Sequence, residues 1–162
     1  MSKIVQAILH LWAVASQKDY KAKRIALHIA QNTLYEYKGI DTLYPDLKDK
    51  YLLLEKRMKD LKMPIYFVEG FRTIPRQNSL SKDVTNAGGL QSYHQYGLAF
   101  DVAFVDLKWN APQTFWDTLG RQGEALGLNW GGEWGDYGHF ELPGFDWREM
   151  KPYFFRSDLV DN

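Results

Sequence analysis

Two imidazoles and one carboxylate in this sequence have the types and spacing of metal ligands. His94 and Asp101 lie in the stretch SYHQYGLAFD, and His139 lies in GDYGHFEL. Histidine and aspartate are common zinc ligands, and three protein ligands with a fourth position open to water are typical of catalytic zinc sites. The chain contains no cysteine, which excludes thiolate metal sites and disulfides. On spacing alone, a hydrogen-bonded His–Asp pair without a metal is the alternative.

A predicted strand over GLAFDVAFV explains how an acid can lie in an apolar stretch. Side chains alternate between the two faces of a strand, so Asp101 shares its face with two alanines that are too small to bury it. Its carboxylate must be paired or bound to a metal, because an unpaired buried charge is very costly. His94 lies just before the turn that Gly97 allows, and His139 begins the last predicted strand. Pairing of the two strands would bring all three residues together.

Acidic residues near His139 are candidates for proton transfer. Asp136 lies three residues before His139, and a tight turn there could place its carboxylate near a metal-bound water, where a general base is needed. The alternative role for Asp136 is to fix the turn. Glu133, in the same loop, is the rival base. Glu141 shares a strand face with His139 and is expected to orient its imidazole without binding the metal.

Arg72 and two tryptophans are candidates for contact with a substrate. Arg72 follows a glycine and an aromatic residue at the end of the predicted strand IYFVEG. Its guanidinium could stabilise an oxyanion or hold a substrate carboxylate; the alternative is a surface arginine paired with Glu69. Trp130 and Trp134 flank the glycines of the loop before His139, and we expect them to line a cleft.

The composition is that of a single globular domain. The chain has 162 residues, of which 45% are hydrophobic and 15% aromatic, as in folded domains. Its 20 basic and 20 acidic residues give a formal net charge of zero, which argues against a nucleic-acid partner. Apolar spacing predicts helices over residues 46–61 and 110–127. FRTIPRQNSL is expected to be a turn leading into a polar surface loop.

Three motifs resemble those of one known family. SYHQYGLAFD resembles the S-x-H-x-x-G-x-A-x-D motif of the zinc D-alanyl-D-alanine carboxypeptidase and L-alanyl-D-glutamate peptidase family, which includes VanY-type carboxypeptidases and several phage endolysins. WGGEWGDYGHFEL resembles its tryptophan-glycine loop followed by D-x-x-H-F. VEGFRTIPRQ resembles its G-[FY]-R-x-x-x-x-Q element. The motifs occur in the family's order, and the resemblance covers residues 43–143.

The resemblance implies a fold and a set of residue roles. The fold is α+β, with helices packed on a small, mainly antiparallel sheet that carries the metal, as in the signalling domain of hedgehog proteins. The implied roles are zinc ligation by His94, Asp101 and His139, catalysis by the base Asp136, oxyanion binding or carbonyl polarisation by Arg72, and substrate contact by Ser92. The tryptophan loop is short, with only Gly135 between Trp134 and Asp136, which keeps Glu133 as a rival base.

The resemblance also implies a substrate. The family acts on stem peptides of bacterial peptidoglycan, and the tryptophan-glycine loop favours an L-alanyl-D-glutamate endopeptidase with a lysin-like or wall-remodelling role. A D-alanyl-D-alanine carboxypeptidase is the close alternative. A non-catalytic zinc-bearing binding module is an alternative of another class, against which the retained Asp136 argues. We expect a monomer that acts on the cell wall, outside the cytoplasm.

The first 40 residues form a separate predicted segment, followed by a zinc peptidase domain over residues 41–162. The apolar run IVQAILHLWAVA ends in the small-x-small pattern of a signal cleavage site, yet its apolar residues also repeat at helical spacing. It is short for a membrane span, which needs about 20 apolar residues. A signal, a membrane anchor and a helical cap over the cleft are the three roles considered for this segment.

Overall fold

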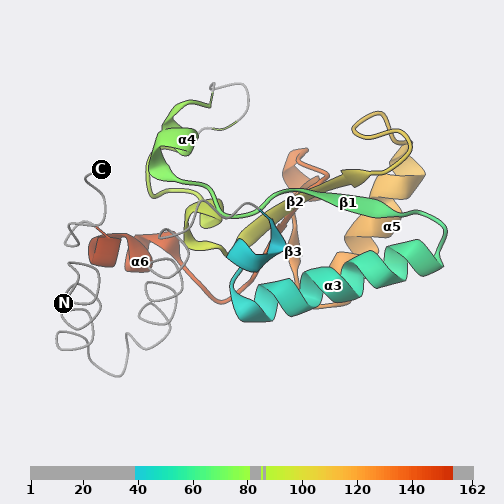
Figure 1. Ribbon diagram of the computed structural model, residues 1–162, viewed down its shortest axis with the longest axis horizontal. Helices are drawn as coiled ribbons and strands as arrows, with labels where there is room; N and C mark the ends of the chain where they lie inside the picture. Colours follow the sequence, from blue (N-terminus) through green and yellow to red (C-terminus); the bar gives the residue numbers. More distant parts are fainter. Residues whose placement is uncertain (1–38, 81–84, 86, 155–162) are drawn as a thin grey trace.

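The computed structural model describes residues 39–80, 85 and 87–154 (Figure 1). A four-stranded sheet with the order β1-β2-β4-β3 forms the centre, and neighbouring strands in it are antiparallel. The elements in chain order are η2 (Ile40–Thr42), α3 (Pro45–Asp60), β1 (Ile65–Glu69), α4 (Ile74–Asn78), η3 (Tyr93–Tyr96), β2 (Ala99–Phe104), α5 (Gln113–Glu124), β3 (Asn129–Trp130), η4 (Gly131–Trp134), β4 (His139–Glu141) and α6 (Trp147–Phe154). The expected α+β fold with a small antiparallel sheet is confirmed.

The register of β2 and β4 gives the sheet two chemically different faces. Phe100 lies opposite Phe140, and Asp101 lies opposite His139. Because neighbouring residues of a strand point to opposite faces, the two phenylalanines share one face and Asp101 and His139 share the other. The phenylalanine rings stack with their centroids 5.4 Å apart and belong to the core.

Helix α3 covers the core face of the sheet, while α4 lies on the opposite side (Figure 1). Apolar residues at helical spacing line the inner side of α3, and those that are buried are Leu47, Tyr51, Leu54 and Met58. The Tyr51 ring meets Phe67 and Phe100 edge to face, each at a centroid distance of 5.3 Å. The helix expected over residues 46–61 is thus confirmed, and it leaves the Asp101 face of the sheet free of α3.

Helix α5 packs against the same core through two glycines. The helix is shorter than the 110–127 expected, since it begins after Pro112, which has an extended backbone conformation. Gly123 faces the Phe140 ring so closely that an added Cβ would lie 2.2 Å from Cε1, and at Gly120 the nearest ring atom, from Trp130, would be 2.4 Å away. Both glycines therefore set the distance between α5 and the sheet.

Substitution of Gly123 by alanine is expected to destabilise the fold. Overpacking of a core position costs about 1–3 kcal/mol, which outweighs the gain of less than about 1 kcal/mol in helix propensity. Urea unfolding measures the free-energy difference. Gly89→Ala is the control, because its added Cβ would meet nothing closer than 3.5 Å. Equal stability of the Gly123 variant and the wild type would contradict the packing described here.

Several elements differ from the sequence expectations. FRTIPRQNSL contains the short helix α4 rather than only a turn, because the Thr73 hydroxyl caps it by accepting a hydrogen bond from the backbone nitrogen of Arg76 at 3.3 Å. Strand β3 and helix α6 were not expected either. The expectation for residues 1–40 falls almost wholly on residues 1–38, outside the described part. No helix in the described ranges is long and apolar enough to span a lipid bilayer.

Candidate active site

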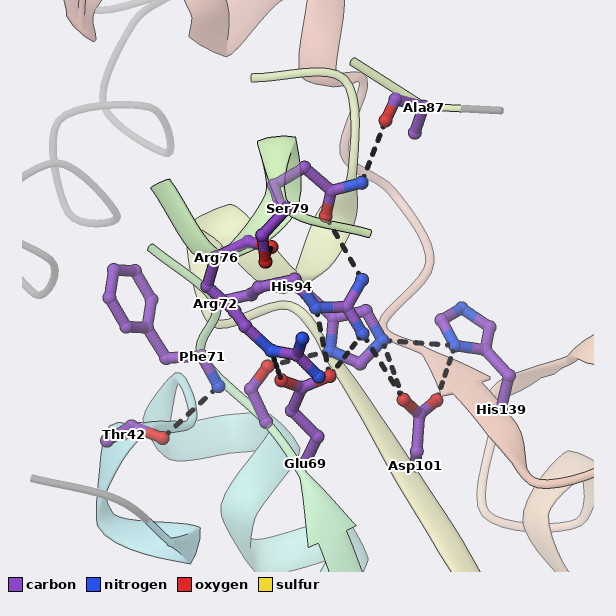
Figure 2. A network of polar contacts seen from close by, with 12 residues as sticks. Thr42, Glu69, Phe71, Arg72, Arg76, Ser79, Ala87, His94, Asp101 and His139 are labelled. Carbon is purple, nitrogen blue, oxygen red and sulfur yellow. Dashed lines mark hydrogen bonds and ion pairs between the residues drawn. The ribbon is translucent and has the colours of Figure 1, made fainter. Parts of the chain in front are cut away.

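Three potential metal ligands meet on the face of the sheet that α3 leaves free (Figure 2). Asp101 comes from β2 and His139 from the opposite position of β4. His94 lies in η3, and Gly97, whose φ of 67° favours glycine, turns the chain from η3 into β2. Asp101 Oδ1 is 2.9 Å from His139 Nδ1, Asp101 Oδ2 is 3.3 Å from His94 Nε2, and the two ring nitrogens are 3.3 Å apart. The convergence expected from strand pairing is therefore present.

The outer nitrogens of both imidazoles have partners that orient the rings. His94 Nδ1 lies 2.7 Å from the Gly70 carbonyl oxygen, and His139 Nε2 lies 3.0 Å from Glu141 Oε1. A carbonyl and a carboxylate only accept, so these outer nitrogens carry protons. In the neutral rings, the lone pairs of His94 Nε2 and His139 Nδ1 then face each other and the Asp101 carboxylate. These electron pairs repel one another, and a cation between them would remove the repulsion.

The donor set fits a zinc ion. With zinc–nitrogen bonds of about 2.0–2.1 Å in tetrahedral geometry, neighbouring donor atoms lie about 3.3 Å apart. Both contacts of His94 Nε2, to His139 Nδ1 and to Asp101 Oδ2, are 3.3 Å. Histidine ligands of zinc usually donate their second N–H to a carbonyl or carboxylate, as both rings do here. The three residues could therefore hold a metal without rearrangement of their strands.

The electrostatics of the metal-free site also favour a positive charge. Burial raises the pKa of Asp101, but the nearby imidazoles His94 and His139 outweigh it and hold that pKa well below its usual range. Burial lowers the pKa of His139, but hydrogen bonds to Asp101 and Glu141 outweigh it and raise the pKa to about 10. Asp101 is thus an anion, and without a metal His139 takes up a proton in compensation.

This proton uptake predicts an unusual pH dependence of the metal-free protein. A raised pKa contributes stability below the unfolded value of 6.5, and that stability is lost as the pH rises towards about 10. The free energy of unfolding, measured with urea in the presence of a chelator, is therefore expected to fall between pH 6.5 and 9. His139→Gln should lose most of this slope. An equal slope in the wild type and His139→Gln would contradict the assignment.

Arg72 is held beside the three residues by a polar network (Figure 2). Its Nε donates to Glu69 Oε2 at 2.9 Å, its Nη1 donates to Gln77 Oε1 at 3.0 Å, and its Nη2 lies 3.5 Å from Asp101 Oδ2. The expected pair with Glu69 is therefore present. Because Arg72 is only 7% exposed, it is not a surface arginine. A fixed, buried guanidinium beside the Asp101 carboxylate is well placed to meet negative charge at the site.

Gln77 is a residue of this network to which the sequence alone assigned no role. It is buried, and its Nε2 donates to the Ala87 carbonyl at 2.8 Å while its oxygen accepts from Arg72. The amide therefore ties Arg72 to the segment that leads to η3. Its presence as the final residue of VEGFRTIPRQ was the available signal, but spacing alone cannot show which group a glutamine contacts.

Asp136 is influenced by the charged groups of the site, whereas Glu133 is an exposed residue of the same loop. The charges of His139, Asp101, His94 and Arg72 all act on the Asp136 carboxyl, and desolvation, the largest influence, raises its pKa although the residue has exposed surface. Glu133 is exposed, and it is not among the main causes of the pKa shifts of Asp101, Asp136 and His139. Of the two rivals, Asp136 is therefore the one for which the structure shows an influence of the metal-ligand cluster.

The absence of a side chain at Gly131 allows the backbone of Asp136 to pack closely against it. An added Cβ at Gly131 would lie 2.4 Å from the Asp136 carbonyl oxygen and 3.0 Å from His139 Cβ. The backbone nitrogen of Asp136 donates to the Gly131 carbonyl at 3.0 Å, and that of His139 donates to the Asp136 carbonyl at 3.1 Å. These contacts fold the η4 loop back onto the first residue of β4.

The expected substrate-contacting residues have different surroundings. Trp134 is 58% exposed, and its ring centroid lies 6.3 Å from that of His139. Trp130 is half-buried against Gly120, and its Nε1 donates to the Tyr137 carbonyl at 2.8 Å, so it supports the loop. Ser92 is half-buried and immediately precedes η3. Substrate contact by these three residues stays a prediction.

Comparison with known proteins places the chain in a family. The family model described as D-alanyl-D-alanine carboxypeptidase matches residues 85–142. The peptidoglycan L-alanyl-D-glutamate endopeptidase CwlK of Bacillus subtilis (strain 168) is 30% identical over 135 residues, which cover 70% of this chain and 81% of CwlK. The chain belongs to the D-alanyl-D-alanine carboxypeptidase and L-alanyl-D-glutamate peptidase family.

A solved structure has a similar fold, and a second one is a weaker match. The L,D-carboxypeptidase DacB from Streptococcus pneumonia is similar with a TM-score of 0.50 and 22% identity, over 70% of this chain and 72% of that chain. The L-Ala D-Glu endopeptidase ChiX of Serratia marcescens has a TM-score of 0.49 and 23% identity, over 62% of this chain and 80% of that chain. The family model spans His94, Asp101, Asp136 and His139, whereas Arg72 precedes it.

Proposed function

We propose that this chain is a zinc-dependent peptidase that cleaves the L-alanyl-D-glutamate bond of peptidoglycan stem peptides. Membership of the family makes it a peptidoglycan-hydrolysing metallopeptidase. The choice of bond is supported by the similarity to CwlK, which is named for that bond. The observation that carries the proposal is the meeting of two imidazole nitrogens and one carboxylate within 3.3 Å, beside a buried arginine and a further carboxylate.

Each side chain around this centre has a separate role in amide hydrolysis. Zinc, when bound by His94, Asp101 and His139, would supply a Lewis acid and lower the pKa of a coordinated water. Asp136 accepts a proton from the attacking water and returns it to the leaving amine. The Arg72 guanidinium stabilises negative charge that develops on the scissile carbonyl oxygen. Glu141 holds His139 in position through its second nitrogen.

Arg72→Ala is expected to lower kcat about 10²–10³-fold, as removal of an oxyanion-stabilising donor does, while zinc content stays at the wild-type level. Arg76→Ala is the matched control, because Arg76 binds the other oxygen of Glu69 at 3.1 Å and is 52% exposed. Its kcat should change little. Steady-state kinetics on a soluble stem peptide measures both. Equal losses of kcat in Arg72→Ala and Arg76→Ala would indicate that the effect comes from the lost ion pair with Glu69 and not from oxyanion stabilisation.

The bond that is cut can be read from the products of digestion. Purified muropeptides are incubated with the zinc-loaded protein and analysed by mass spectrometry. Cleavage between L-alanine and D-glutamate supports the proposal. Release of terminal D-alanine alone would instead assign a D-alanyl-D-alanine carboxypeptidase. Absence of any zinc-dependent product, with zinc bound, would favour a non-catalytic binding module.

A substrate in the cell wall implies action outside the cytoplasm. The similarity to CwlK supports the peptidoglycan partner. Fractionation of cells that express the full chain, and of cells that express residues 39–162, tests whether residues 1–38 bring the enzyme to the envelope or the membrane. Loss of envelope association on truncation would favour a signal or an anchor, and unchanged association would favour a helical cap.

A further inference from the structure

An exposed row of aromatic rings lies beside the candidate active site. Trp116 of α5 is 5% exposed and stands between Trp109 and Tyr137, which are 54% and 37% exposed. Its ring centroid is 6.2 Å from each, with interplanar angles of 15° to Trp109 and 27° to Tyr137. The buried ring of Trp116 is thus stacked with each of the two exposed rings. Trp109 and Tyr137 are called the aromatic platform below.

The platform is connected to the metal-ligand cluster through the residues that precede His139. Tyr137 lies between Asp136 and Gly138, the residue before His139. Trp109 packs over Gly138, where an added Cβ would be 2.7 Å from the tryptophan Cζ3. The β2–α5 connection that carries Trp109 lies on the side of the sheet away from α3 (Figure 1). Tyr137 belongs to the short segment that leads into the ligand His139, and Trp109 contacts that segment at Gly138.

The backbone around both exposed rings is fixed. The Tyr137 carbonyl accepts a hydrogen bond from Trp130 Nε1 at 2.8 Å. The turn before Trp109 is closed by the Lys108 nitrogen, which donates to the Phe104 carbonyl at 2.9 Å, and the Asn110 nitrogen donates to the Leu107 carbonyl at 2.9 Å. Rings held in this way lose little conformational entropy when a ligand covers them. Large exposed apolar patches usually mark interaction sites.

We propose that the aromatic platform binds a sugar ring of the glycan strand while the attached stem peptide occupies the metal site. This inference rests on the proposed function. In peptidoglycan, the L-alanine of the stem is joined through a lactyl group to the sugar, so the L-alanyl-D-glutamate bond is the peptide bond nearest the glycan. An amino-acid residue spans at most about 3.6 Å, which places a sugar close to any L-alanyl-D-glutamate bond held at the metal.

The chemistry of the platform suits a pyranose ring. The face of a pyranose presents C–H groups with a partial positive charge, and the face of an aromatic ring is negative. Trp109 and Tyr137 offer such faces without a charged group of their own. The terminal D-alanyl-D-alanine bond lies at the far end of the stem, so a sugar site beside the metal also matches the choice of bond proposed above.

The test compares two substrates that differ only in the sugar. One is a disaccharide-linked stem peptide, and the other is the same peptide without the sugar. Trp109→Ala is expected to lower kcat/KM about fivefold to tenfold for the sugar-linked substrate and to leave the free peptide within about twofold of the wild type. Trp109→Phe should restore most of the loss. Leu53→Ala is the matched control, because Leu53 is a 51% exposed apolar residue on α3 and should affect neither substrate.

A binding measurement without peptide separates this proposal from the proposed function. The disaccharide alone is titrated into the zinc-loaded protein and followed by tryptophan fluorescence and NMR. Binding in the wild type that weakens in Trp109→Ala supports the platform even if no peptide is cut. The proposal is overturned by an absence of disaccharide binding, by equal kinetic losses for both substrates, or by Trp109-dependent binding to anionic lipid vesicles with no response to the sugar.

Discussion

His139→Ala is expected to remove zinc and peptidase activity together. The imidazole supplies one of three protein donors and is held between Asp101 and Glu141. Loss of Lewis-acid stabilisation worth several kcal/mol corresponds to a fall in kcat/KM of more than about a thousandfold. Elemental analysis after dialysis gives the zinc content, and digestion of a soluble stem peptide gives the activity.

A substitution of Glu141 distinguishes loss of the ligand His139 from loss of the group that orients it. Glu141→Gln keeps an acceptor for His139 Nε2 but removes the negative charge, so zinc affinity should fall about tenfold to a hundredfold and activity should return in excess zinc. His139→Ala should not recover in the same way. Circular dichroism establishes that both variants are folded. A folded His139→Ala protein that keeps one zinc and full activity would refute the role of His139.

Asp136→Asn is expected to keep the zinc and lose turnover. A general base contributes about 10²–10⁴-fold to the rate, and the amide cannot accept the proton that the carboxylate takes. Because Asp136 is not one of the three clustered donors, zinc content should match the wild type. The measured quantity is kcat on the soluble stem peptide at saturating zinc.

Glu133→Gln is the matched control for Asp136→Asn. Both acids belong to the loop before β4, and the pKa of Asp136 responds to the charges of the ligand cluster. Glu133→Gln should therefore retain at least about half of the wild-type kcat, in line with a surface substitution. The opposite pattern, with turnover lost in Glu133→Gln and kept in Asp136→Asn, would make Glu133 the base.

The position of the metal-ligand cluster followed from strand patterns. Alternation along GLAFDVAFV placed Asp101 on the opposite face from Phe100, and pairing with the HFEL strand then brought in His139. The structure has this arrangement, with Asp101 opposite His139 and Phe100 opposite Phe140. Such inferences succeed because the period of two in a strand is fixed by backbone geometry, and because an acid in an apolar strand needs a compensating charge.

The network around Arg72 could not be derived in the same way. Spacing suggests the pair with Glu69, but the contact with Gln77 depends on helix α4, a segment in which the sequence pattern indicates only a turn. A five-residue helix has too little apolar periodicity to be seen, and its signals are only a capping threonine and a proline. The role of Trp130 as a support for the loop likewise depends on Gly120, a contact between distant segments.

The most direct test is a crystal structure of the protein grown with zinc, with anomalous data collected on both sides of the zinc absorption edge. We expect one strong anomalous peak about 2.0–2.2 Å from a nitrogen of each imidazole and an oxygen of Asp101. Zinc bound elsewhere, with His94, Asp101 and His139 making only hydrogen bonds to one another, would contradict it.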